Sequence, residues 1–191
     1  MIRNLNGAVS DWAILLGASR LEDDRGYFGE IFHQDQVNEI IGTEIDWKQD
    51  NNSMSHKVGT LRGLHFQAPP CAQAKLVRCG QGAIFDVVVD IRLGSPTYGK
   101  WEGYELSEEN ARLVYVPEGF AHGFVTLRPN SEIIYKCSRY YSPETEGSIH
   151  WDDPDVGIKW PLTGDAILSE KDKKAPFFRD LESPFSWGET S

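Results

Sequence analysis

Leu61-Arg62-Gly63-Leu64-His65-Phe66-Gln67 is the stretch that decides how the rest of the chain is interpreted, because it joins a strand pattern to a reactive side chain. Side chains alternate between the two faces of a strand, so His65 shares a face with Gly63 and Gln67. A neutral imidazole suits proton abstraction near pH 7. The ammonium of Lys75, ten residues further on, can stabilise an oxygen that becomes negative. The alternative is a core histidine bonded to a neighbour, and the strand alone leaves both open.

The residues around this strand predict the fold. From Gly59 onward, short apolar runs alternate with turn signals about every ten residues, which is typical of an all-β sandwich or barrel. Gly59 and Gly63 also leave room for a ligand close to the backbone. Residues 128–131 have the composition of a hairpin loop. We expect a barrel core over about residues 45–141, with strands at residues 74–79, 83–91, 99–106, 113–116, 122–127 and 132–137.

The flanking segments are predicted to add short helices and irregular structure. Before the barrel we expect strands at 12–16 and 27–32, a turn at 23–26 and a polar turn at 49–53. Asp35 is a candidate cap for a helix over residues 36–41, which Gly42 would end. After residue 141, prolines and tryptophans indicate irregular segments packed over the barrel, with a short helix beginning at Ser169. Without a repeat or a linker, the pattern predicts one domain over residues 1–191.

The strand at 83–91 contains two aspartates whose position decides their role. Phe85 and Val87 belong to an apolar face, whereas Asp86 and Asp90 share the other face with Val88. Carboxylates buried among β-branched residues are costly unless they are paired. Either this face is exposed to solvent, or it forms an interior polar site in which Asp86 meets a lysine or arginine such as Lys75 or Arg62.

Composition and charge exclude several classes of function. The chain has 191 residues, of which 40% are hydrophobic, and no apolar run approaches the roughly 20 residues that span a bilayer. The first ten residues show no signal peptide. Three cysteines without CxxC spacing fit a reducing compartment, so we expect a cytoplasmic protein. A net charge of −10 argues against nucleic acid as a partner but does not exclude a small anionic ligand.

Pro117-Glu118-Gly119-Phe120-Ala121-His122 has the PxGxxH spacing of the second cupin motif. The first cupin motif normally supplies metal ligands, but here it is reduced to His65-Phe66-Gln67. Gln67 is a poor ligand for a transition metal, and protonated Lys75 would repel a cation. The sequence therefore predicts a cupin-like jelly roll that has no metal site.

A longer series of motifs resembles the dTDP-4-dehydrorhamnose 3,5-epimerase family over most of residues 25–172. The matching segments, in order, are 49–53, 61–67, 75–77, 85–92, 95–96, 117–124, 135–137, 152–154 and 168–172. The resemblance implies an isomerase that needs no cofactor. It would convert dTDP-4-dehydro-6-deoxy-D-glucose to dTDP-4-dehydro-L-rhamnose by epimerisation at C3 and C5. That step belongs to dTDP-L-rhamnose biosynthesis, a source of carbohydrate for lipopolysaccharide and O-antigen.

The resemblance also implies roles for individual residues. His65 would be the base that takes the proton, and Asp172 would be its partner in a dyad. Lys75 would stabilise the enolate oxygen. Tyr135 would return a proton from the opposite face. The implied substrate-binding residues are Arg25, Glu30, Gln49, Asp50, Asn51, Arg62, His122, Glu146 and Lys171.

For three of these binding residues the sequence leaves another interpretation open or sets a geometric condition. Arg25 and Lys171 could equally be solvated surface charges. Arg62 would point away from His65 on a regular strand, so its role implies a bulge or twist near Gly63. Family members are dimers that share strands, so we expect a homodimer in which residues 1–34 pair with the partner's sheet.

Three rival functions are considered. A related enzyme could invert only C3 or C5 of another deoxysugar nucleotide. A non-catalytic cupin could bind the sugar nucleotide, although binding alone does not need the dyad of His65 and Asp172. A metal-dependent cupin would need the ligands that are missing around Gln67.

Overall fold

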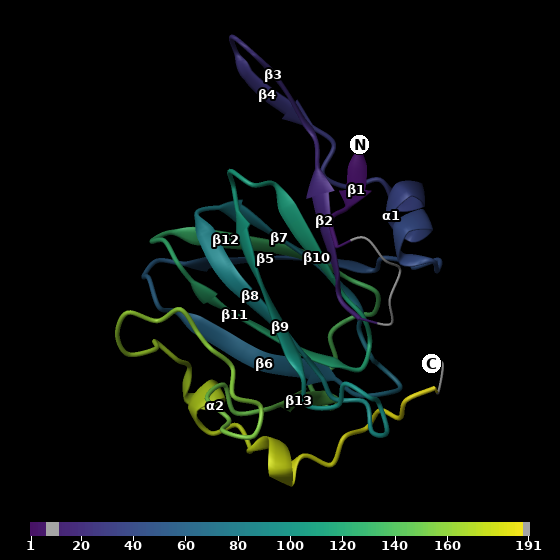
Figure 1. Cartoon of the computed structure of the whole chain (residues 1–191), viewed down its shortest axis with the longest axis vertical. Helices are drawn as coiled ribbons and strands as arrows, with labels where there is room; N and C mark the ends of the chain where they lie inside the picture. The colour runs from purple at the N-terminus through teal and green to yellow at the C-terminus, as the bar shows by residue number, and fades with distance from the viewer. Residues whose placement is uncertain (7–11, 189–191) are drawn as a thin grey trace.

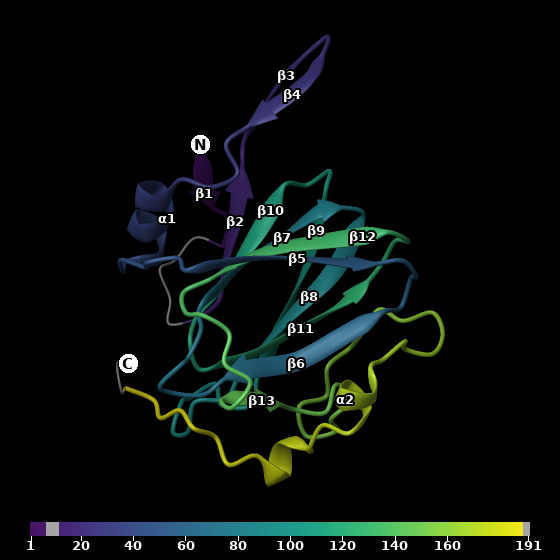
Figure 2. The same cartoon turned by 180° about the vertical axis from the view of Figure 1, so that it is seen from behind.

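The computed structural model describes residues 1–6 and 12–188, and two antiparallel sheets face one another in it (Figure 1, Figure 2). The first sheet has the order β1 (Ile2–Asn4), β2 (Ile14–Ala18), β10 (Arg112–Val116), β7 (Lys75–Gln81), β12 (Ser131–Cys137), β5 (Gln49–Ser55). The second has the order β13 (Glu146–Ser148), β6 (Leu61–Gln67), β11 (Phe120–Thr126), β8 (Ala83–Asp90), β9 (Trp101–Ser107). The predicted single domain also includes residues 7–11 and 189–191, which lie outside the described residues, and it stays a prediction.

The path of the chain between the sheets is that of a jelly roll. From β5 to β12 the chain changes sheet at every connection except the one between β8 and β9. Each of the six predicted strands from residue 74 to residue 137 overlaps an observed strand, with ends shifted by at most two residues. The predicted all-β, cupin-like fold is therefore confirmed. The hairpin expected at residues 128–131 is wrong, because β11 already has β6 and β8 on its two sides and β12 pairs with β5 and β7.

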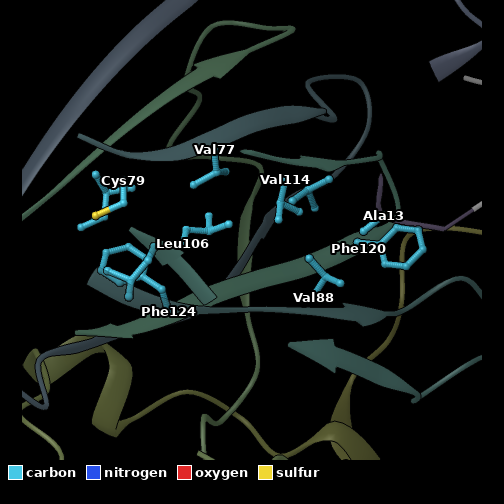
Figure 3. Packing of buried hydrophobic residues seen from close by; sticks show 11 residues of the cluster. Ala13, Val77, Cys79, Val88, Leu106, Val114, Phe120 and Phe124 are labelled. Atoms are coloured by element: carbon cyan, nitrogen blue, oxygen red, sulfur yellow. The ribbon is translucent and has the colours of Figure 1, made fainter. Parts of the chain in front are cut away.

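The interior of the barrel is filled from both sheets. Val77 and Val114 from the first sheet meet Val88 and Phe124 from the second in one buried cluster (Figure 3). On β8, Val88 points into this interior while Val87 points outward into a second cluster. The alternation inferred for this strand is thus confirmed, and its aspartate-bearing face is the inner one.

The C-terminal segment covers the outer face of the second sheet, as predicted. The ring of Trp160 packs edge-on against Phe85 of β8 with centroids 6.4 Å apart, and Phe178 and Phe185 belong to the same outer cluster. The segment contains α2 (Glu170–Lys173) and a single 3₁₀ turn at Phe178–Asp180. Ser169 is the N-cap of α2, which confirms the predicted start of this helix.

The N-terminal part partly follows the prediction. Helix α1 (Gln34–Ile41) covers the outer face of the first sheet, and Gly42 ends it with φ of 75°. Asp35 is not its cap, because the helix begins at Gln34, two residues before the predicted start, and places Asp35 in the first turn, where a carboxylate favours the helix dipole. Among the described residues, no helix is long and apolar enough to cross a bilayer.

The segment at 49–53, predicted as a turn, is part of strand β5. Its side chains alternate between more and less exposed positions, and it pairs along its whole length with β12. The polar composition of this segment predicted a turn, but β5 is the last strand of its sheet, where polar side chains are tolerated on both faces.

A hairpin of β3 (Arg20–Asp23) and β4 (Gly26–Gly29) projects away from the barrel, and we call it the arm (Figure 1, Figure 2). The turn at its tip is confirmed, but the strand expected at 27–32 ends at Gly29. The prediction that residues 1–34 pair with a partner's sheet does not hold for β2, which lies between β1 and β10 of the same chain. For β1, the edge strand of its sheet, and for the arm it stays a prediction.

Candidate active site

A cavity of about 440 Å³ opens into the barrel between the two sheets. The four predicted catalytic residues, His65, Lys75, Tyr135 and Asp172, all line it, although they come from β6, β7, β12 and α2. Its other lining residues are Ser53, Thr60, Leu61, Arg62, His122, Gly123, Phe124, Ile133, Ile167, Leu168, Ser169 and Lys171. The fold therefore brings together side chains that are distant in the sequence, such as His65 and Asp172, which are 107 residues apart.

His65 and Asp172 form a directly bonded pair. The Nε2–H of His65 donates to Oδ1 of Asp172 at 2.6 Å, and Asp172 is only 3% exposed. Burial acts to raise the pKa of Asp172, but its hydrogen bonds with His65 and Ser169 outweigh that effect and lower it. The carboxylate is therefore ionised near neutral pH. Because Nε2 is the protonated nitrogen, Nδ1 of His65 keeps its lone pair.

Strand β6 is irregular where the sequence required it to be. His65 pairs with His122 of β11, whereas Arg62 pairs with Phe124, so β6 holds one residue more than β11 between these pairs. This bulge lets both Arg62 and His65 line the cavity, which confirms the irregularity expected near Gly63. The space left by Gly63 is filled by β11 rather than by a ligand, since a Cβ there would lie 2.6 Å from the Cα of Gly123.

Lys75 lies in the interior near several acidic groups. Burial lowers the pKa of its ammonium, and Cys137, Asp86 and Glu146 act in the opposite direction. Burial also raises the pKa of the Cys137 thiol, so Asp86 and Glu146 are the groups that carry negative charge near pH 7. The charge on Lys75 therefore depends on these two carboxylates.

Asp86 is an interior site residue that the sequence left undecided. It is fully buried, and its Oδ2 accepts a hydrogen bond from Nε2 of His122 at 2.8 Å. The bonded partner is thus a histidine, and not Lys75 or Arg62. Within the described residues its Oδ1 has no hydrogen-bond partner. His122, which lines the cavity, accordingly belongs to a second histidine–aspartate pair beside the first, because His122 and His65 are register partners on β11 and β6.

Tyr135 brings a phenol to the cavity from the first sheet. Burial raises the pKa of its hydroxyl, while the nearby charge of Arg62 acts to lower it. The phenol is therefore protonated at neutral pH. In the described part of the chain its hydroxyl has no hydrogen-bond partner, which leaves the proton available to a ligand.

A second lobe of about 250 Å³ shares His65, Lys75 and Tyr135 with the first cavity. Amide side chains dominate its wall, and Gln49 donates to Asn51 at 2.9 Å. Across the lobe, Glu146 accepts a hydrogen bond from the hydroxyl of Tyr141 at 3.0 Å and forms an ion pair with Lys171. Six of the predicted binding residues thus line one lobe or the other, namely Gln49, Asn51, Arg62, His122, Glu146 and Lys171.

Three predicted binding residues are not brought to this cavity. Arg25 lies at the tip of the arm and pairs with Asp23, and Glu30 accepts a hydrogen bond from Gln36. Asp50 forms an ion pair with Lys136 at 2.9 Å on the outer face of the first sheet. The alternation of β5 turns the side chain of Asp50 away from Gln49 and Asn51, so its role in binding stays a prediction.

Gln67 stands where a cupin would have a metal ligand, but its amide is used otherwise. Its Nε2 donates to the carbonyl of Cys71 at 2.7 Å, and its Oε1 accepts from the backbone N–H of Ser142 at 2.7 Å. Residues 1–6 and 12–188 contain no group of three or more His, Cys, Asp or Glu side chains that could hold a metal ion. Gln67 therefore ties two loops together.

Fold and site together define a cupin-like barrel enzyme whose interior is equipped for proton transfer. Residues 8–180 match the model of the dTDP-4-dehydrorhamnose 3,5-epimerase family. The chain belongs to this family. A relative of that name from Salmonella typhimurium is 53% identical over 169 residues, which cover 88% of this chain and 91% of that protein.

Solved structures of related enzymes have the same fold at lower sequence identity. The dTDP-6-deoxy-D-glucose-3,5-epimerase of Legionella pneumophila, in complex with dTDP-4-keto-L-rhamnose, has 40% identity and a TM-score of 0.92 over the whole of both chains. A 3'-monoepimerase from Streptomyces bikiniensis, in complex with dTDP-quinovose, has 37% identity and a TM-score of 0.82 over 86% of this chain and 83% of that one.

Proposed function

We propose that this protein converts dTDP-4-dehydro-6-deoxy-D-glucose to dTDP-4-dehydro-L-rhamnose by inverting C3 and C5 without a cofactor. Family membership supports the proposal. The observation that carries it is the convergence of His65, Asp172, Lys75 and Tyr135 on one cavity. C3 and C5 both flank the C4 ketone, which acidifies their protons, so one base and one oxyanion donor serve both carbons.

His65 begins each inversion by taking the proton from carbon. Its Nε2–H is held by Asp172, which leaves Nδ1 as the basic nitrogen. As the imidazolium forms, the buried carboxylate of Asp172 stabilises its charge across the 2.6 Å hydrogen bond. The pair therefore fixes the tautomer and favours the charged product of the first step.

Lys75 stabilises the oxygen at C4 as the enolate develops. A cation in a buried site is worth more to a developing anion than the same cation in water, because the surroundings screen it less. Its burial also lowers the pKa of Lys75, so Asp86 and Glu146 are needed to keep the ammonium charged. His122, held by Asp86, adds a polar group to the same cavity from the second sheet.

Tyr135 completes the inversion by giving a proton from the other face of the enolate. Return of the proton by His65 would only restore the starting centre. A phenol whose pKa is raised by burial is protonated at working pH, so Tyr135 is ready to act as the acid.

The two lobes support a division of the substrate between them. Arg62 and Lys171 are the cations for the diphosphate, since guanidinium and ammonium groups suit phosphate oxygens. The amides of Gln49 and Asn51 offer both donors and acceptors to the nucleoside. Glu146 would have to exchange its contact with Lys171 when the diphosphate arrives.

The protein acts as a homodimer in this proposal, with the arm reaching the partner's site. The arm exposes Leu21, Tyr27 and Phe28 at 71%, 59% and 72%, which is unusual for apolar side chains without a covering surface. Arg25 lies in the turn of the arm and Glu30 directly follows β4, so both would reach the site of the partner subunit. Light scattering should give a dimer for the intact chain and a monomer after deletion of residues 20–29. A stable monomer of the intact chain at micromolar concentration would contradict the proposal.

We place the reaction in the cytoplasm, where the product would serve carbohydrate biosynthesis, including lipopolysaccharide and O-antigen. Support comes from Cys71, Cys79 and Cys137, which are free thiols, as expected in a reducing compartment. We also propose that the whole of residues 1–191 acts as one domain.

The deciding experiment is incubation with the keto sugar nucleotide in D₂O, followed by NMR. Deuterium should enter at both C3 and C5, and the product should have the L-rhamno configuration. Prior dialysis against EDTA should leave the rate unchanged, because Gln67 and Lys75 stand in place of metal ligands. Loss of activity that zinc or iron restores would favour a metal-dependent cupin.

A single-centre epimerase is the second candidate, favoured by the likeness to the Streptomyces bikiniensis monoepimerase. The same experiment separates the two, because such an enzyme would give a product inverted at one carbon. Binding of dTDP without deuterium entry at either carbon would instead indicate a non-catalytic sugar-nucleotide cupin.

A further inference from the structure

The second oxygen of Asp172 is held by a residue with no assigned role. The hydroxyl of Ser169 donates to Oδ2 of Asp172 at 2.8 Å, while Oδ1 of the same carboxylate accepts from His65. Ser169 Oγ also accepts the backbone N–H of Asp172 at 3.1 Å. The hydroxyl therefore contacts Asp172 twice, and the carboxylate cannot rotate without breaking one of these bonds.

A structural role as helix cap does not account for both contacts. A cap needs only an acceptor for a free N–H near the start of the helix, and the bond from Asp172 N satisfies that need. The donor bond to Oδ2 is additional. The segment is also held in place before the helix begins, since Ile167 exchanges backbone hydrogen bonds with Gly59 and Leu61 at 2.8 and 2.9 Å.

We propose that Ser169 is the third member of a Ser169–Asp172–His65 relay and is a positioning residue that tunes the strength of His65 as a base. The inference rests on the proposed function, in which His65 takes the proton. Ser169 does not touch the reacting carbon in this scheme. It acts by fixing the direction of the carboxylate and by withdrawing part of its negative charge.

The charge argument gives the direction of the effect. A hydroxyl bonded to Oδ2 spreads the negative charge of Asp172 away from Oδ1, so the imidazolium of His65 is held less tightly and releases its proton more readily. Loss of the hydroxyl should keep His65 protonated to higher pH. The other charged or titratable groups that line the two lobes with His65 are Arg62, Lys75, His122, Tyr135, Cys137, Tyr141, Glu146 and Lys171. The substitutions below leave these groups unchanged, and also Asp86, which is bonded to His122.

Two substitutions separate the relay from the cap. Threonine and glycine are N-caps of similar strength, but only threonine has a hydroxyl. Ser169→Thr should retain near-native kcat. Ser169→Gly should lower kcat roughly tenfold, as loss of an outer hydrogen-bond partner commonly does, and should move the acid limb of kcat/KM up by about half a pH unit. The Kd for dTDP should stay the same in both, because Lys171 on α2 keeps its place.

The outcomes are decisive in either direction. If Ser169→Gly and Ser169→Thr share the native kcat and acid limb, Ser169 is only a cap and the relay is refuted. If Ser169→Gly raises the Kd for dTDP and lowers the unfolding temperature without moving the acid limb, its role is structural and the relay is again refuted. Failure of the unmodified protein to exchange deuterium would refute the proposed function itself, which the native control reveals independently.

Discussion

Strand β8 carries two aspartates that are equally buried, both at 0% exposure, yet differ in their surroundings. Asp90 accepts two hydrogen bonds from the guanidinium of Arg92, at 2.9 and 2.7 Å, and others from Ser95 and Thr97. Asp86 has one bonded partner, His122, and an Oδ1 with none in the described residues. A buried carboxylate is thus either satisfied by the protein, which makes it structural, or left incompletely satisfied beside a cavity, which marks it as functional.

The surroundings of Arg92 show how completely the charge of Asp90 is satisfied by the protein. Its guanidinium lies between the rings of Phe120 and Trp187, with its central carbon 4.4 Å from each centroid. Burial acts to raise the pKa of Asp90, but the bonds from Arg92 and the hydroxyls outweigh it and lower it. The pair therefore joins the end of β8 to the C-terminal segment.

The largest expected effect on activity comes from a substitution at the cavity, where the functional residues lie. His65→Ala should reduce deuterium exchange at both carbons by roughly 1,000-fold or more, because a single base begins each inversion. Its unfolding temperature and its affinity for dTDP should stay near native. Asp172→Asn, the matched control, should lose less because the base remains. Undiminished exchange in His65→Ala would place the base elsewhere.

Asp90→Asn tests the structural role of the Asp90–Arg92 pair. Removing one charge leaves Arg92 buried without its counter-charge, so we expect a loss of about 3–5 kcal/mol in the free energy of unfolding, measured by urea denaturation. The native stability due to Asp90 should be present above the usual carboxyl pKa and should fall as pH drops through its lowered pKa. Activity of the folded variant should be near native. A large fall in kcat without loss of stability would contradict the structural role of Asp90.

Tyr135→Phe removes a hydroxyl that, like Oδ1 of Asp86, has no partner in the described part of the protein. Inversion should fall roughly 10- to 100-fold at the carbon whose far face only the phenol reaches. Proton exchange through His65 should survive, so a partly inverted product is expected. Deuterium uptake and stereochemistry must be followed together. Inversion of both centres at the native rate would show that another group is the acid.

Asp86→Asn should give the smallest effect, and it contrasts directly with Asp90→Asn. Without the charge of Asp86, the pKa of buried Lys75 should fall further, so the ammonium is lost at lower pH. The basic limb of the pH profile should therefore move down by about one unit, with kcat reduced roughly tenfold. Stability should be unchanged or higher. A native pH profile combined with unfolding would make Asp86 structural.

These two aspartates also show how far sequence patterns reach. Alternation along β8 correctly put both on one face, because strand geometry is local. Whether that face pointed to solvent or to the interior could not be decided, because it depends on the sheet that packs opposite. The motif around Ser169 likewise predicted the start of α2, but not that its hydroxyl would face Asp172.

Errors in the prediction arose where a segment depends on distant partners. The composition of residues 49–53 predicts a turn, although pairing with β12 makes the segment a strand and turns Asp50 outward. The resemblance places Arg25 and Glu30 in the site, whereas the arm carries Arg25 away from the barrel of its own chain, so their role depends on a partner subunit and stays a prediction. The prediction of Asp35 as a cap is wrong because the helix begins at Gln34, two residues before the predicted start.

The sequence by itself determined the strands between residues 74 and 137, the interior motif at His65 and the family, because these depend on local periodicity and on residues at fixed spacing. Only the tertiary structure decided which side chains meet. Asp172 reaches His65 across 107 positions, and the bulge near Gly63 turns Arg62 and His65 toward the same cavity. Such contacts depend on the packing of two sheets and a C-terminal segment, which no local pattern specifies.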